Sequence, residues 1–155
     1  AVFVQSANGV NCFPSLITLL PAMKLNNTDL LNLSLEQIAS AIGDPTETVF
    51  TLLYQRHPEL AAFSREDTSW QHYMIQEILQ NLMELADNPE SALAIIRDMT
   101  LHHQMIVLEA NTFKGMYSAL HDVVVPHLSG PHREDMSSLW ENSVQRICQS
   151  VDSAF

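Results

Sequence analysis

The chain has 155 residues, of which 46% are apolar, and a formal net charge of −11. This length and apolar content are typical of one folded domain with a sizeable core, and they exclude an intrinsically disordered chain. The seven Lys and Arg residues are scattered along the sequence and cannot neutralise a row of phosphates. We therefore expect neither a nucleic acid nor a membrane as partner.

Cysteine content and the N-terminal residues predict the compartment. Cys12 and Cys148 are too few for a disulfide framework, and no zinc-type spacing of Cys and His is present, so we expect free thiols in a reducing compartment. The first twenty residues hold no Lys or Arg, so CFPSLITLLPA lacks the charged flank of a signal peptide. It is also too short to span a bilayer, which favours a cytoplasmic protein.

The sequence divides into an N-terminal extension, residues 1–26, and one helical domain, residues 27–155. The extension contains an Asn-Gly turn and the apolar run SLITLLPA, which we expect to pack on the domain or on a second subunit. The domain shows no alternating strand pattern, and seven or eight helices with short connections predict an all-α fold.

The predicted helices follow from caps, breakers and apolar spacing. The first begins at Asn27 or Thr28 and ends at Gly43, and the second ends before Pro58 because the residue before proline avoids helical angles. A polar connector is expected over residues 61–69. The later helices are predicted within residues 69–87, 88–109, 110–126 and 129–155.

Two adjacent histidines stand in RDMTLHHQMIVL, residues 97–108, within an apolar helical pattern. Neighbouring helix positions point about 100° apart, so only one of His102 and His103 can face inward squarely. His102 has acidic residues at helical spacing, whereas the residues spaced around His103 are all apolar: Ile96, Met99, Ile106 and Val107. We predict that His103 faces the core, either bonded to a backbone carbonyl or as a metal ligand.

Standard catalytic motifs do not offer a competing site. The sequence contains no GxSxG, HExxH, P-loop or glycine-rich dinucleotide motif. Seven methionines predict an adaptable interior, which suits a bulky flat cofactor and an ordinary core equally well.

The succession of segments over residues 27–155 resembles the globin family, in particular bacterial single-domain haemoglobins and the haem domain of flavohaemoglobins. FTLLYQRHPEL is similar to the family's second helix running into a short third helix with a proline, here Pro58. Phe63 matches the phenylalanine that globins stack against haem, and Trp140 in SSLWENSV matches a tryptophan of the last helix. The resemblance implies a globin-like, three-over-three helical sandwich that binds haem b.

The spacing of the family's iron site is also present. His103 lies ten residues before Phe113, as the proximal histidine of bacterial globins lies ten residues before an aromatic residue, and His102 misses this spacing by one. The resemblance thus implies that His103 binds the iron. Gln71 lies 32 residues before His103, which matches a distal glutamine, and Ile75 follows on the same helix face as an apolar residue over the iron.

Other residues are expected around this site. His72 is the alternative distal residue, and it would bind iron in a six-coordinate state without gas, although Gln76 would then occupy the apolar position. His102 is expected at a haem propionate or in solvent. The expected pocket walls, each of which also fits an ordinary core, are Phe50, Phe63, Ile75, Leu79, Met99, Leu108 and Phe113.

Three phenylalanines depart from the family pattern. Phe50 occupies the place of a tyrosine that donates to oxygen in many bacterial globins, which implies faster O₂ release. Phe113 and Phe155 occupy the places of the tyrosine and glutamate that hydrogen-bond the proximal imidazole in flavohaemoglobins. Such partners would push electron density to the iron, so their absence argues against a peroxidase or nitric-oxide dioxygenase specialisation.

The expected function is reversible binding of O₂, CO or NO at a haem iron held by His103, with Gln71 on the distal side. One alternative is a gas sensor, in which ligand binding shifts a helix at a homodimer interface. Another is a haem-free interaction module of the same fold, in which His103 is only a core residue. A haem dioxygenase is the remaining alternative.

Overall fold

The computed structural model describes residues 23–64, 67–106 and 109–155, so the apolar run SLITLLPA and Leu108 lie outside the described residues. All regular structure in these ranges is helical, which confirms the all-α class. The α-helices are α1 (Asn27–Ile42), α2 (Thr46–Arg56), α3 (Ser69–Asp87), α4 (Pro89–Met105), α5 (Ala110–Val124) and α6 (Arg133–Ala154). Two 3₁₀ helices, η2 (Pro58–Ser64) and η3 (Val125–His127), follow α2 and α5.

Local sequence explains where the first helices begin and end. The Asn26 side chain accepts a hydrogen bond from the backbone N–H of Asp29 at 2.8 Å and so satisfies a free donor at the start of α1. Gly43 ends α1 with a φ of 72°, a left-handed conformation that costs little without a Cβ. Asp44 then accepts the N–H of Thr46 at 2.8 Å, which caps the first turn of α2.

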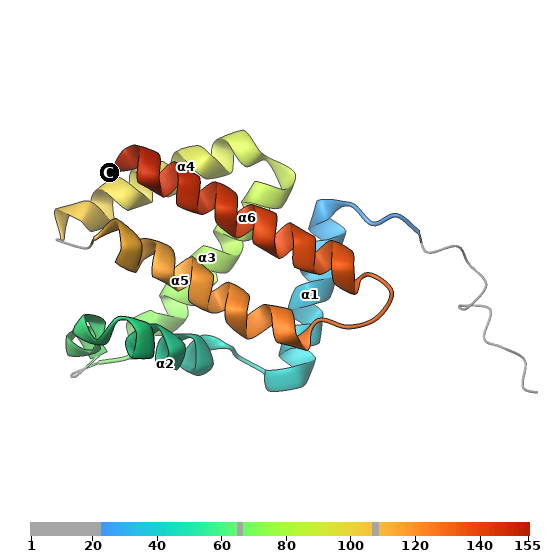
Figure 1. Ribbon diagram of the computed structural model, residues 1–155, viewed down its shortest axis with the longest axis horizontal. Coiled ribbons are helices and arrows are strands. Elements are labelled where there is room, and N and C mark those ends of the chain that lie inside the picture. Colours follow the sequence, from blue (N-terminus) through green and yellow to red (C-terminus); the bar gives the residue numbers. More distant parts are fainter. Residues whose placement is uncertain (1–22, 65–66, 107–108) are drawn as a thin grey trace, which may run out of the picture.

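The helices pack around one core (Figure 1). α3 and α4 are joined at Asn88 and pack against each other, and α4 also packs on α6. α5 lies between α2 and α6, and α1 contacts α3 and α6. Because each helix buries one apolar face against several neighbours, the core is continuous from α1 to α6.

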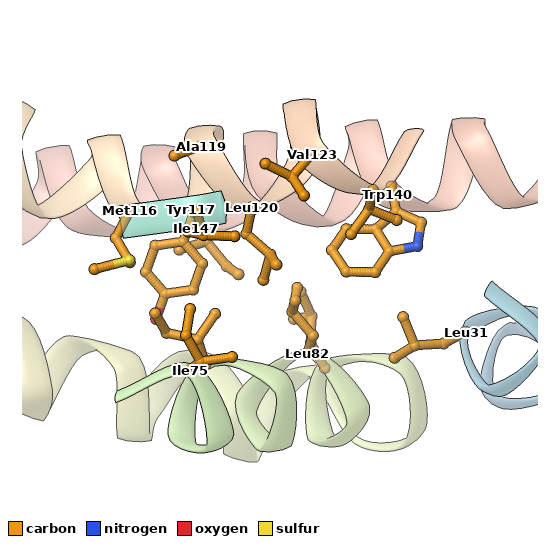
Figure 2. Packing of buried hydrophobic residues seen from close by; sticks show 14 of the residues in the cluster. Leu31, Ile75, Leu82, Met116, Tyr117, Ala119, Leu120, Val123, Trp140 and Ile147 are labelled. Atoms are coloured by element: carbon orange, nitrogen blue, oxygen red, sulfur yellow. The ribbon is translucent and has the colours of Figure 1, made fainter. Parts of the chain in front are cut away.

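The largest fully buried side chain is Trp140 of α6, which is 1% exposed. Its indole N–H donates to Ser34 Oγ of α1 at 2.8 Å, and Ser34 in turn donates to the carbonyl of Leu31. Figure 2 shows Trp140 near Leu31 and Leu82, at one end of the packed cluster, with Tyr117 and Ile75 at the other. The two buried polar groups thus satisfy one another within an apolar surrounding.

Two segments differ from the predicted elements. Part of the predicted polar connector forms η2, which begins at Pro58, where the fixed φ of proline suits the first turn of a helix. α4 ends at Met105 instead of near residue 109, and the N–H of Ile106 bonds back to the carbonyls of His103 and Gln104. Ile106 is therefore 57% exposed instead of continuing the buried stripe.

None of the helices described here has the length and apolar character needed to cross a bilayer.

Candidate functional site

An apolar cavity of about 360 Å³ lies among α2, η2, α3, α4 and α5. Its volume is in the range of pockets that bind small molecules and cofactors. Phe63 and Ile106 line the cavity and are 59% and 57% exposed, so the cavity opens to solvent between η2 and the end of α4. The lining residues are Phe50, Leu53, Tyr54, Leu60, Phe63, Trp70, Met74, Ile78, Met99, His103, Ile106, Thr112, Phe113, Met116 and Tyr117.

His103 is the titratable imidazole in this wall. Its Nδ1 lies 2.8 Å from the backbone carbonyl oxygen of Met99, one helical turn earlier. A carbonyl oxygen only accepts, so Nδ1 carries the proton and donates it. In the neutral ring, Nε2 then keeps its lone pair, which is the form of imidazole that binds a metal ion.

Phe113 holds the His103 ring from α5. The two ring centroids are 4.9 Å apart at an interplanar angle of 57°, and Phe113 is only 6% exposed. The backbone hydrogen bond and this aromatic contact restrict the imidazole from two sides. The structure thus brings His103, Met99 and Phe113, which the sequence analysis expects around one pocket, together at the cavity.

α3 presents to the cavity a face other than the predicted one. Trp70, Met74 and Ile78, at intervals of four residues, line the cavity. Ile75 is buried in the core at 3% exposure, where Figure 2 shows it beside Tyr117, and Leu79 packs on the core without lining the cavity. The helix is therefore turned by about one position, or about 100°, from the orientation that the resemblance implies.

Gln71 does not line the cavity but contacts a residue that does. Gln71 is 8% exposed, and its side-chain Nε2 donates to the Tyr54 hydroxyl at 2.7 Å. Tyr54 lines the cavity on α2, four residues after Phe50, and the two rings are 5.7 Å apart. A hydroxyl that accepts one hydrogen bond still has its own proton to donate. Tyr54 therefore brings an O–H group to a wall where the sequence predicts only Phe50.

The remaining two candidate histidines lie away from the cavity. His72 has a side chain that is 60% exposed, and its Nδ1 is 3.0 Å from Asp44 Oδ2 in the connection between α1 and α2. His102 is exposed, with its ring centroid 6.3 Å from that of His103. This separation follows from the 100° between adjacent helix positions. Neither residue lines the cavity as the structure stands.

Tyr117 also lines the cavity, and its hydroxyl is buried. It is 2% exposed, and within the described residues its Oη has no hydrogen-bond partner. Burial raises the pKa of Tyr117 to about 12, although the Asn81 side chain beside it lowers it in part. Tyr117 is thus a neutral phenol at physiological pH, and Figure 2 shows it directed from α5 toward Ile75 of α3.

Ten lining residues were not predicted as part of the site: Leu53, Tyr54, Leu60, Trp70, Met74, Ile78, Ile106, Thr112, Met116 and Tyr117. A spacing of four was visible for several of them, since Tyr54 follows Phe50, Tyr117 follows Phe113, and Trp70, Met74 and Ile78 follow one another at this interval. The same helices carry other apolar stripes, however, and the sequence gives no means of choosing among them.

The donor set of the site is limited. The ranges 23–64, 67–106 and 109–155 contain no group of three or more His, Cys, Asp and Glu side chains placed to hold a metal ion. A metal at this cavity would depend on His103 together with a larger cofactor. No protein-family model matches the sequence, and no curated protein matches it at a significant level.

Proposed function

We propose that the chain is a globin-like protein that binds haem b in this cavity and reversibly binds a diatomic gas, with His103 as the proximal ligand of the iron. The observation that carries the proposal is the His103 imidazole in the cavity wall, with Nδ1–H donated to the Met99 carbonyl at 2.8 Å. A backbone acceptor of this kind is the usual partner that orients a metal-binding histidine.

The residues present fit this cofactor. The cavity wall is mostly aromatic and aliphatic, which suits a flat macrocycle, and His103 offers the single nitrogen that a five-coordinate iron needs. When bound, haem supplies an iron with an open position for O₂, CO or NO. Phe63 at the exposed side of the cavity would lie against the edge of the ring.

The order of elements supports a globin-like arrangement of the helices. α2 runs into the short helix η2, which carries Phe63 to the cavity, and α3 and α4 follow and both line the cavity. α5 then brings Phe113 against His103, and α6 closes the core with Trp140. These positions support the roles that the resemblance implies for Phe63, Phe113 and Trp140.

Tyr54 and Gln71 are the polar pair that would select the gas. The amide of Gln71 fixes the Tyr54 hydroxyl at 2.7 Å, which leaves the phenolic proton for a ligand in the cavity. A donor in an apolar cavity favours O₂ over CO, because O₂ draws more electron density from the metal and accepts a stronger hydrogen bond. Such a bond contributes about 0.5–1.5 kcal/mol, or more to a charged acceptor.

The test is the visible absorption spectrum of the full chain with added hemin, oxidised, reduced and under CO. We expect a strong Soret band that sharpens with CO in the unmodified protein and in His102→Ala, and that collapses in His103→Ala. His102 is the matched control, because it is adjacent, exposed and outside the cavity wall. A spectrum equal to that of free hemin in all three proteins would refute haem binding.

A second candidate function is an interaction or sensor module of the same fold. It is favoured by exposed apolar side chains near the end of α4, where Leu101 is 45%, Met105 82% and Ile106 57% exposed. Contiguous exposed apolar residues commonly mark contact surfaces. Sedimentation of the hemin-free and hemin-loaded chains, with Met105→Glu as the variant, tests this function. Concentration-dependent association lost in the variant supports it, and a monomer throughout contradicts self-association.

A further inference from the structure

The cavity is lined by His103 of α4 and also by a methionine, Met74, of the neighbouring helix α3. α3 and α4 meet at Asn88, and Met74 lies fourteen residues before this turn while His103 lies fifteen after it. With a rise of about 1.5 Å per residue, both side chains start about 21–23 Å along their helices from the turn. Both side chains line the cavity. The two helices that carry them, α3 in green and α4 in yellow, can be followed in Figure 1.

Met74 is the α3 side chain in this wall with an uncommitted ligand atom. The Trp70 indole N–H donates to the carbonyl of Asp67 at 2.8 Å and has no lone pair to offer, and Ile78 is aliphatic. Among the described contacts the Met74 sulfur takes part in no hydrogen bond.

The two polar residues predicted for the distal side are engaged elsewhere. Gln71 donates its amide to the Tyr54 hydroxyl, and His72 lies in solvent beside Asp44. Bringing either to the iron would break an existing contact and rotate α3 away from its buried face. Met74 needs neither change, since it already faces the cavity.

We propose that Met74 would supply a second protein ligand to the iron in addition to His103, so that the resting protein would hold haem through an imidazole and a thioether. This inference rests on the proposed haem binding. A thioether carries no proton, so the bond between Met74 Sδ and iron forms without proton release. The soft sulfur favours the ferrous state and raises the reduction potential relative to a five-coordinate histidine site.

Met74 would also regulate gas binding. A diatomic gas must displace the sulfur before it reaches the iron, so the observed rate of binding is limited by dissociation of Met74. Methionine is unbranched and has three rotatable side-chain bonds, which lets the sulfur move away without movement of the backbone. The gas affinity of the site is then set by competition with a residue of the chain itself.

Two further methionines in the wall serve as matched controls. Met99 lies on the helix of His103, and its sulfur accepts a hydrogen bond from Asn81 Nδ2 at 3.2 Å. Met116 lies on α5 and is 5% exposed. Replacement of each by Leu conserves volume and apolar character, so the three variants differ mainly in which sulfur is removed.

The experiment uses the full chain loaded with hemin and records near-infrared absorption and magnetic circular dichroism of the ferric form. It also records the midpoint potential and CO-binding kinetics. We expect the methionine-to-iron charge-transfer band in the unmodified protein, Met99→Leu and Met116→Leu, and its loss in Met74→Leu. Met74→Leu should also have a lower midpoint potential, and its CO-binding rate should rise linearly with CO where that of the unmodified protein saturates.

A substitution to histidine tests whether position 74 reaches the iron. Met74→His should give the low-spin spectrum of two histidine ligands, which a remote residue would not produce. A His103-dependent Soret band without the thioether signature, or with a signature that survives in Met74→Leu, overturns the inference and leaves haem binding intact. Absence of any His103-dependent Soret band overturns both.

Discussion

The two tyrosines of the cavity wall should respond to loss of their hydroxyls in opposite directions. Tyr117 is 2% exposed and its Oη has no partner within hydrogen-bond geometry among the described residues, although the Asn81 side chain lies near enough to lower its pKa. This group therefore loses its water on folding and gains little in return. A buried unsatisfied hydroxyl costs about 1–3 kcal/mol. Tyr117→Phe keeps the ring and its packing against Phe113 at 5.9 Å, and should increase the free energy of unfolding by about 1–2 kcal/mol.

Tyr54→Phe is the matched comparison. This substitution removes the hydroxyl that accepts the 2.7 Å hydrogen bond from the Gln71 amide. Because Gln71 is only 8% exposed, its amide is then buried without a partner. We expect a loss of about 1–2 kcal/mol in unfolding free energy. Urea unfolding at neutral pH, with an unchanged m-value, measures both effects. In a chain of this length about 1 kcal/mol moves the thermal midpoint by about 2–4 °C.

The stability of Tyr117→Phe should also depend less on alkaline pH. Burial raises the pKa of Tyr117 to about 12, above the value of about 10 expected in the unfolded chain. The folded state therefore retains this proton between pH 10 and 12 while the unfolded state loses it, and stability falls by about 1.4 kcal/mol per pH unit there. In Tyr117→Phe, the decrease of unfolding free energy with pH between pH 10 and 12 should be smaller by this amount.

A destabilised Tyr117→Phe protein would refute this reasoning. A loss of more than about 1 kcal/mol would mean that the hydroxyl has a hydrogen-bond partner in solution, either the neighbouring Asn81 side chain or a trapped water. An unchanged alkaline slope would likewise contradict the burial of the phenol.

Three further predictions concern the fold. Trp140→Phe removes the bond to Ser34 Oγ and part of a 1%-exposed side chain, and should cost about 2–4 kcal/mol in urea unfolding. Trp70→Phe should cost less because Trp70 is only partly buried. Asn26→Ala should lower the thermal midpoint through loss of a cap worth about 0.5–2 kcal/mol, with little change for Asn26→Asp. The Asp44 pKa is lowered mainly by the hydrogen bond from the Thr46 side chain, so Asp44 stabilises the folded chain at neutral pH and loses this effect as pH falls through the carboxylate range. Acid titration of unfolding should show a shallower slope in Asp44→Asn, and an identical slope would contradict the role of this contact.

Much of the helical framework could be predicted from local sequence. Gly43 and Pro58 ended helices where expected, because both act through their own backbone angles and need no distant partner. The choice between His102 and His103 also followed from neighbours at helical spacing, and the structure has His102 exposed and His103 in the cavity wall.

The orientation of α3 was decided by tertiary packing. Its sequence carries the apolar spacing of Trp70, Met74 and Ile78 as well as a stripe one residue further on, and either could face the cavity. The second stripe, which includes Ile75, is buried against the core, so the first is left to line the cavity.

By itself, the sequence determined an all-α chain, the sites where its first helices begin and end, and an inward-facing His103. Only the tertiary structure decided that the Gln71 amide meets Tyr54 from another helix, that Met74 shares the cavity with His103, and that α4 stops at Met105. Helix periodicity fixes which residues share a face, whereas the rotation of that face depends on side chains that pack against it from distant parts of the chain.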